Sequence, residues 1–186
     1  MVMKYFTFIC ILAFLVVPQV ASAHPETGLL PDAIAETEYK IVLEINPKDI
    51  ATRTKLGMVL YRKNKLKEAE QQIAEALRSA PQDFDAHDVM GLIRLKEKKL
   101  AEAIVWFQKA IAIKSEDTMV HHSLGLAFEQ TGQYREAEAS YRRGLEVNDR
   151  LLRKGTNREK EKERRNTLLS ALQGVQSRLK TSRGGI

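Results

Sequence analysis

The sequence predicts an all-α solenoid of three repeated helix pairs, with a half-repeat before them and a C-terminal capping helix after them. The main observation is a Leu-Gly or Met-Gly dipeptide that recurs every 34 residues, at Gly57, Gly91 and Gly125. The second is composition. Of the 186 residues, 44% are hydrophobic and 29% are charged, which is ordinary for a globular chain and excludes global disorder.

The first element, residues 1–23, has the pattern of a secretory signal peptide. Lys4 supplies a positive charge, an uncharged run of thirteen residues follows at 5–17, and Ala21-Ser22-Ala23 offers a small-x-small cleavage site. A membrane-spanning helix needs about 20 apolar residues. We therefore expect export with cleavage after Ala23, and an uncleaved inner-membrane anchor is the alternative.

The single cysteine, Cys10, lies inside this apolar run. Cleavage would leave a mature chain without cysteine, which suits an oxidising compartment. A disulfide scaffold, a cysteine-based zinc site and thiol catalysis are thereby excluded. Residues 24–30 are expected to form a loose N-terminus.

The 34-residue spacing extends to further positions in the chain. It relates alanines (Ala69, Ala103, Ala137), bulky apolar residues (Ile73, Phe107, Tyr141) and small residues (Ala76, Ala110, Gly144). The repeats are expected at 50–83, 84–117 and 118–151. Their first helices are expected over 50–63, 84–97 and 118–131, and their second helices over 66–80, 100–114 and 134–148.

These positions resemble the tetratricopeptide repeat (TPR) family, whose consensus has a Leu-Gly type pair in the first helix and Ala-x3-aromatic in the second. The resemblance implies a right-handed solenoid. Gly57, Gly91 and Gly125 would let the second helix approach closely, and the alanines of the second helices would face that approach. The small residues would admit the next repeat.

The half-repeat at 31–49 is predicted by stepping back one period. Ala35 and Tyr39 take the alanine and aromatic positions, and Pro47 closes the unit. Such a half-repeat would cover the exposed face of the first full repeat, because each solenoid unit buries its apolar surface only on its neighbours.

The last segment, 152–186, is expected to be a basic C-terminal capping helix or a degenerate fourth repeat. Thr156 and Glu159 have the spacing of a capping box. An apolar stripe at helical spacing follows, formed by Leu168, Leu172, Val175 and Leu179. This stripe is expected to pack onto the third repeat, and a coiled coil that joins two copies into a homo-oligomer is the alternative.

The formal charge of +6 is unevenly distributed. Residues 150–186 hold eleven lysines or arginines against three glutamates, and Arg153–Arg165 holds seven of these bases. One interpretation is a solvated helix face on which Glu159, Glu161 and Glu163 alternate with the bases. The other is a surface that contacts anionic membrane or an acidic partner. Nucleic acid is not expected, because no aromatic residue interleaves the bases.

No local pattern indicates catalysis or a cofactor. The chain lacks a glycine-rich phosphate loop, and His121 and His122 are adjacent, so they point about 100° apart on a helix. His87 lies one period before His121, where a packing role is expected. We therefore predict a non-enzymatic protein without metal or cofactor, and metal binding through His24, His87 or His122 is the alternative.

The resemblance implies that a partner peptide binds along the first helices. The peptide-groove residues carried over are Met58, Tyr61, Asp85, Asp88, Leu92, Leu95, His122 and Leu126, with Ala51, Thr54, Lys55, Val89, Met119 and Ser123 on the same faces. The Lys and Asn clamp with which some relatives bind a C-terminal carboxylate is absent. An apolar or basic peptide is the expected ligand, unless several of these residues belong to the core.

The function predicted from the sequence is that of an exported adaptor or scaffold that binds a protein or peptide partner. Arrays of this size resemble bacterial envelope proteins, which implies the periplasm. Their roles include envelope assembly, secretion, pilus assembly and cytochrome c maturation. A self-assembling structural oligomer is the alternative.

Overall fold

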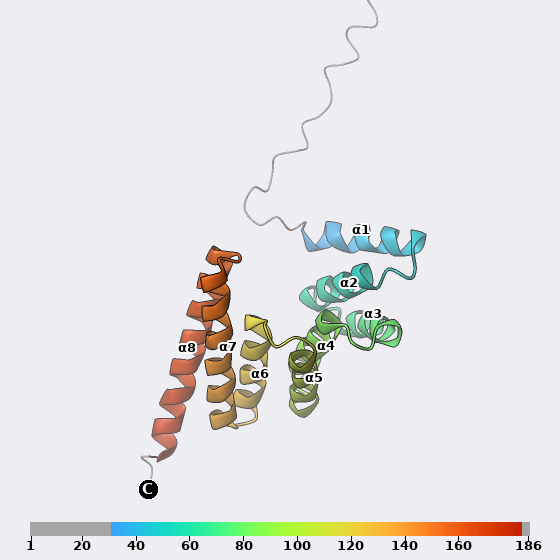
Figure 1. The fold of residues 1–186 in the computed structure, drawn as a ribbon. Coiled ribbons are helices and arrows are strands. Elements are labelled where there is room, and N and C mark those ends of the chain that lie inside the picture. The colour runs from blue at the N-terminus through green and yellow to red at the C-terminus, as the bar shows by residue number, and fades with distance from the viewer. Residues whose placement is uncertain (1–30, 184–186) are drawn as a thin grey trace, which may run out of the picture. The chain divides into compact units, whose positions relative to one another are not determined.

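The computed structural model describes residues 31–183, with side chains to residue 181. The described part forms eight helices and no strand (Figure 1). The expected signal peptide, the loose N-terminus and His24 lie outside the described residues. The helices all belong to one compact unit, Asp32–Ile186. They are α1 (Asp32–Ile45), α2 (Ile50–Arg62), α3 (Leu66–Ser79), α4 (Phe84–Lys96), α5 (Leu100–Ile113), α6 (Thr118–Gln130), α7 (Tyr134–Lys154) and α8 (Arg158–Arg183).

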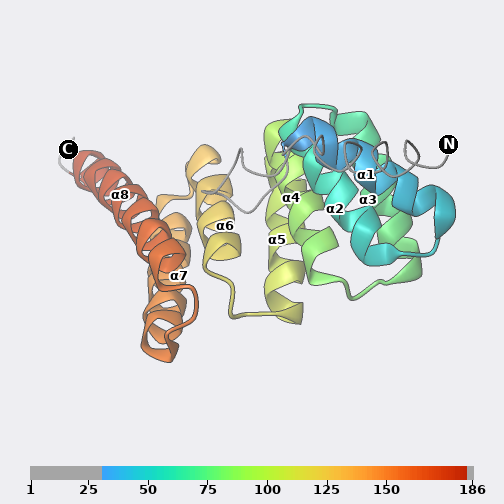
Figure 2. The same ribbon diagram turned by 90° about the horizontal axis from the view of Figure 1, so that it is seen from above.

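Helices α2 to α7 form three hairpins that pack on one another in chain order. Helix α2 pairs with α3, α4 with α5 and α6 with α7, while α3 packs on α4 and α5 on α6. The first helices also touch, α2 with α4 and α4 with α6. Helix α1 covers α2 at one end, and α8 lies beside α7 at the other (Figure 2). The predicted all-α repeat fold is confirmed.

The glycines of the first helices lie where the two helices of each repeat approach most closely. A Cβ at Gly57 would come within 2.5 Å of Ile73 Cδ1, and one at Gly91 within 2.5 Å of Phe107 Cε1. Gly125 faces Tyr141 in the same way. Bulky side chains thus fill the space that the missing Cβ leaves, at the packing density of a protein interior. The second-helix alanines, Ala69, Ala103 and Ala137, are fully buried in these hairpins.

Each first helix begins after an aspartate that caps it. Asp49, Asp83 and Asp117 each accept a hydrogen bond from a backbone N–H two or three residues further along, at 3.0, 2.7 and 2.8 Å respectively. These bonds satisfy donors that a helix N-terminus otherwise leaves free. The three caps are 34 residues apart, so the repeat fixes the start of each first helix as well as its packing.

Helix α1 is held to the first repeat by a buried carboxylate. Glu36 is only 5% exposed and forms ion pairs with Lys40 (2.7 Å), Lys63 (2.5 Å) and Lys65 (2.9 Å). Hydrogen bonds from these three lysines hold the pKa of Glu36 well below its usual range. The half-repeat is therefore joined to its neighbour by charge as well as by apolar contact.

The C-terminal region differs from the expectation in its boundaries. The expected limit of the third repeat, between residues 151 and 152, falls inside α7, which continues to Lys154 and ends at Gly155 in the left-handed conformation (φ 74°). The structure describes both Thr156 and Glu159, and the capping box expected there is wrong. Helix α8 begins only at Arg158, and Glu159 pairs with Lys162 (2.7 Å).

The apolar stripe of α8 packs inside the molecule. Leu168 and Val175 are fully buried beside Tyr141, and Leu172 and Leu179 are partly buried against the same cluster. The expected packing of the stripe on the third repeat is thus found, and Leu168 and Val175 are not available to join two copies. Helix α8 is a single capping helix.

Polar side chains fix the start of α8. Glu161 is 3% exposed and accepts hydrogen bonds from Thr118 Oγ1 (2.9 Å) and Asn148 Nδ2 (2.7 Å), and Arg164 pairs with it at 2.6 Å. We call these four residues the C-terminal joint, since they connect α6, α7 and α8. The interpretation of Glu161 as part of a solvated charged face is wrong. The burial of Glu161 lets α8 dock closely at this point.

Candidate functional site

The pocket between α2 and α4 is the candidate site, because it lies among the first-helix residues that the sequence analysis singled out. Its volume is about 280 Å³. We call it the Asp88 pocket, and its lining consists of Ala51, Thr54, Lys55, Met58, Asp83, Asp85, Asp88 and Val89. Three of the eight predicted groove residues, Met58, Asp85 and Asp88, are therefore brought together.

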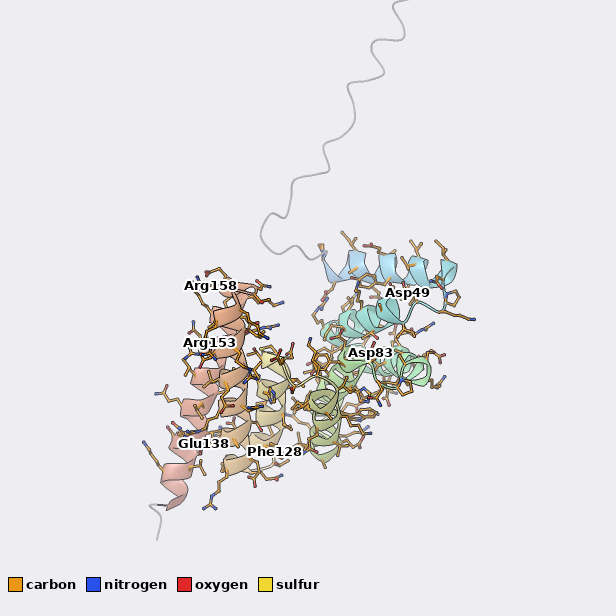
Figure 3. The ribbon with its side chains drawn as sticks, in the orientation of Figure 1. Asp49, Asp83, Phe128, Glu138, Arg153 and Arg158 are labelled. Atoms are coloured by element: carbon orange, nitrogen blue, oxygen red, sulfur yellow. The ribbon has the colours of Figure 1, made fainter. Side chains whose placement is uncertain are left out.

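The repeat geometry explains why these side chains meet. Asp49 and Asp83 cap α2 and α4, one period apart, and both lie at the starts of their helices in Figure 3. Because α2 and α4 pack against each other, the same helix face is presented twice. Asp83 was not among the predicted groove residues. The regular spacing of Asp49, Asp83 and Asp117 is the signal that could have identified it.

Asp88 is half-buried, and one oxygen of its carboxylate is withdrawn from water. Its Oδ1 is buried and forms no hydrogen bond with any residue that the structure describes. Burial, and after it the negative charges of Asp117 and Asp85, raise the pKa of Asp88 to about 7. Partial loss of contact with water is also the main cause of the raised pKa of Asp85, although this residue stays largely exposed. Asp85 and Asp88 thus form no ion pair with any described residue, although the charge of Lys114 acts on Asp85.

A second polar atom of the pocket is also unpaired. Thr54 is 5% exposed, and its Oγ1 has no hydrogen-bond partner among the described residues. Thr54 lies on α2 and Asp88 on α4, so the two helices each contribute an unsatisfied group to one pocket. Most buried polar side-chain atoms in native proteins have a partner, so two orphans in one pocket require an explanation.

The other predicted groove residues lie outside the pocket. Tyr61 is half-buried, with Lys96 Nζ 4.8 Å from its ring centroid, and burial followed by the charge of Asp88 raises its pKa. Leu92 and Leu126 are half-buried against the core of the second and third repeats.

Two further predicted groove residues, Leu95 and His122, have less accessible surface that a ligand could contact. Leu95 is only 9% exposed and belongs to the core. The ring of His122 lies 5.7 Å from that of Tyr141, and burial lowers its pKa. The surface left for a ligand is therefore concentrated on α2 and α4.

The other histidines have packing partners. His87 lies against Trp106, with ring centroids 5.4 Å apart, and its Nδ1 is 2.8 Å from the Asp83 carbonyl oxygen. His121 Nε2 is 3.1 Å from the carbonyl oxygen of Ser115. Over the residues described, no three histidine, cysteine or carboxylate side chains are grouped so that they could hold a metal ion.

The basic segment Arg153–Arg165 is partly neutralised. Lys154, Lys162, Arg164 and Arg165 pair with carboxylates of α8 or of neighbouring elements. The remaining bases are exposed without an ion pair to any described residue: Arg153, Arg158 and Lys160. Figure 3 shows Arg153 and Arg158 at the turn between α7 and α8. None of the helices described has the length and apolar character needed to cross a membrane.

The paired helices define a helical-repeat protein, a class that presents extended surfaces to protein partners. Two family models, both described as tetratricopeptide repeat, match residues 54–118 and 120–150. The chain belongs to the tetratricopeptide repeat family. No curated protein sequence matches it.

Solved structures of MamA are similar to this chain. One has a TM-score of 0.58 at 18% identity, and the match covers 82% of this chain and 91% of that MamA chain. Another has a TM-score of 0.57 at 18% identity, with 83% and 87% covered. MamA 41-end from Desulfovibrio magneticus RS-1 has a TM-score of 0.56 at 23% identity, with 62% and 66% covered. At these identities the likeness concerns the fold.

Proposed function

We propose that this protein is a non-enzymatic adaptor that binds an extended or helical segment of a partner protein along α2 and α4. The observation that carries the proposal is the Asp88 pocket, which lies on the first helices where the family binds peptides. Its lining residues combine apolar side chains, such as Met58 and Val89, with Thr54 and Asp88, each of which has a buried polar atom without a hydrogen-bond partner among the described residues. Such a mixture is typical of binding sites.

Half-buried side chains beside the pocket support a contact longer than one residue. Tyr61 and Leu92 are partly accessible on α2 and α4, and Leu126 continues the row on α6. Tyrosine offers a large apolar body with a polar end, and the thioether of Met58 adapts to different partners. These residues suit an apolar segment that carries some polar or charged positions.

The proposal extends to the place of action. The charged start, the apolar run and Ala21-Ser22-Ala23 support export to the bacterial periplasm, with a role in envelope assembly, secretion, pilus assembly or cytochrome c maturation. The exposed Arg153, Arg158 and Lys160 support a contact with anionic membrane surface.

Site-specific photocrosslinking in the native host tests the binding surface. A photoreactive amino acid replaces Lys55, which is exposed and lines the pocket, or Val105, which is 48% exposed on α5 and serves as the control. We expect one dominant crosslinked partner from position 55 and none from position 105. Equal products from both positions, or crosslinks only between copies of this chain, would contradict the proposal.

A pair of substitutions gives an independent test. Met58→Glu combined with Leu92→Glu places charge on the apolar surface and should abolish the crosslink from position 55. Val105→Glu adds a charge elsewhere and should leave it intact. Circular dichroism must show equal helicity in both variants. If the double variant still crosslinks the partner from position 55 as the wild type does, the binding surface does not include Met58 and Leu92.

A further inference from the structure

We propose that the Asp88 pocket receives the side chain of a lysine or arginine from the partner, with the Asp88 carboxylate as its counter-ion. This inference rests on the proposed function, because it names the chemistry that the partner brings to the surface. It is carried by the buried, unpartnered Oδ1 of Asp88, a residue that lines the pocket, together with the composition of the lining.

The charges around the pocket call for a cation. Asp83, Asp85 and Asp88 line it, and Asp117 at the start of α6 is close enough to raise the pKa of Asp88. Lys55 lines the same pocket, but no lysine or arginine in the described part lies within ion-pair distance of Asp85 or Asp88. An ionised carboxylate removed from water without a partner is unfavourable, and a cation from outside would relieve that cost.

The shape and the remaining lining indicate an organic cation on an apolar stem. The Asp88 pocket, at about 280 Å³, is just below the range of about 300–1,000 Å³ found for drug-sized molecules, so it has room for one long side chain. Ala51, Met58 and Val89 offer apolar contacts to methylene groups. Lysine and arginine combine such a stem with a charged end.

The two orphaned polar atoms match the donors of that charged end. Asp88 Oδ1 can accept a charge-assisted hydrogen bond from an ammonium or guanidinium group, and Thr54 Oγ1 can accept a second one. A bound metal ion fits less well, because no cluster of three ligating side chains exists among the described residues. A neutral apolar side chain would fill the pocket but leave both oxygen atoms unpaired.

Nuclear magnetic resonance titrations of the whole protein with small probes test the pocket without the partner. The probes are N-acetyl-lysine N-methylamide and N-acetyl-arginine N-methylamide, with the norleucine analogue as an uncharged control of similar length. We expect saturable shifts at the backbone amides of Thr54, Asp88 and Val89 with the cationic probes only. Equal shifts with norleucine, or no shifts with any probe, would overturn the inference.

Two matched variants identify the counter-ion. Asp88→Asn removes the charge with little change of shape, and Glu38→Gln removes one charge from the exposed surface of α1. The cationic probes should bind Asp88→Asn at least about tenfold more weakly, since a hydrogen bond to a charged group contributes about 1.5–3 kcal/mol. Glu38→Gln should bind as the wild type does, and undiminished binding by Asp88→Asn would refute the assignment.

These outcomes separate the two proposals. A partner that crosslinks from position 55 equally well in Asp88→Asn would refute the cation pocket while supporting the adaptor function. Probe binding that depends on Asp88, in a protein that captures no partner from position 55, would support the pocket and refute the adaptor function.

Discussion

Two carboxylates of this protein, the buried Glu161 and the half-buried Asp88, differ in whether they have partners. At the C-terminal joint, Glu161 is 3% exposed and meets Thr118, Asn148 and Arg164 at 2.6–2.9 Å. In the pocket between α2 and α4, Asp88 Oδ1 is buried with no hydrogen-bond partner among the described residues. The first carboxylate is neutralised within the molecule, and the second has no counter-ion among the described residues, which agrees with the proposed cation pocket.

The difference shows how to distinguish a structural charge from a binding charge. A buried ion pair is tolerated when hydrogen bonds satisfy both members, and it then specifies how elements dock. A buried charge without a partner lowers stability and is retained where it has a function. Glu161 therefore holds α8 in place, whereas the unpaired Asp88 lowers the stability of the free protein, which agrees with the proposed role in binding.

The largest expected effect is at the C-terminal joint. Glu161→Ala should lower the free energy of unfolding by about 2–4 kcal/mol, because Thr118, Asn148 and Arg164 each lose a charged partner. Urea denaturation followed by circular dichroism measures the change. Glu163→Ala, at an exposed neighbouring glutamate, should change stability by less than about 0.5 kcal/mol. Equal losses in both variants would show that Glu161 is not the joint's central residue.

The pocket should respond in the opposite direction. Asp88→Asn should raise the free energy of unfolding by about 1–3 kcal/mol at pH 8, since a pKa raised from its ordinary value to about 7 reflects an unfavourable buried charge. Asp88 binds its proton more tightly in the folded wild type than in the unfolded chain. Asp88 therefore lowers the free energy of unfolding more and more as pH rises from about 4 to 7.

The difference between Asp88→Asn and wild type should therefore be small at pH 4 and reach its full value above pH 7. Unfolding at both pH values measures it, and other titrating groups affect the two proteins alike. An Asp88→Asn variant less stable than wild type at pH 8 would mean that Asp88 has a structural partner after all.

Two threonine variants compare the C-terminal joint with the Asp88 pocket through smaller changes in the free energy of unfolding. Thr118 donates a hydrogen bond to Glu161, whereas the buried hydroxyl of Thr54 has no partner. Thr118→Val should lower the free energy of unfolding by about 1–2 kcal/mol. Thr54→Val should leave it unchanged or raise it slightly, because no bond is lost. Thermal unfolding of the two variants side by side tests this, and a similar loss in both would remove the distinction between the two regions.

The sequence was sufficient for the repeat architecture because period and packing are directly linked. Gly57, Gly91 and Gly125 recur at one spacing because each faces the bulky side chain at the matching position of its second helix. A solenoid unit contacts only the units beside it. The position of Asp88 on α4 followed from the same register. That its carboxylate has no partner could not be predicted, because this depends on the side chains that α2 and α6 present.

The C-terminal region was less predictable because it departs from the period. Glu161 stands between Glu159 and Glu163 in a row of alternating charges, and nothing local distinguishes the buried glutamate from its exposed neighbours. The rotation of α8 on α7 decides which one is covered. Thr156 likewise has the chemistry of a cap, but Gly155 ends α7 so that α8 begins only at Arg158.

The pKa of the Asp88 carboxyl gives the most direct test of its proposed role as a counter-ion. It is measured from the resonance of the carboxyl carbon during a pH titration, with and without N-acetyl-lysine N-methylamide. We expect a value near 7 in the free protein. We also expect a clear decrease with the lysine probe, since a cation favours the ionised form, and no change with the norleucine analogue. A pKa that is ordinary in the free protein, or that responds equally to both probes, would contradict the role of Asp88 as a counter-ion.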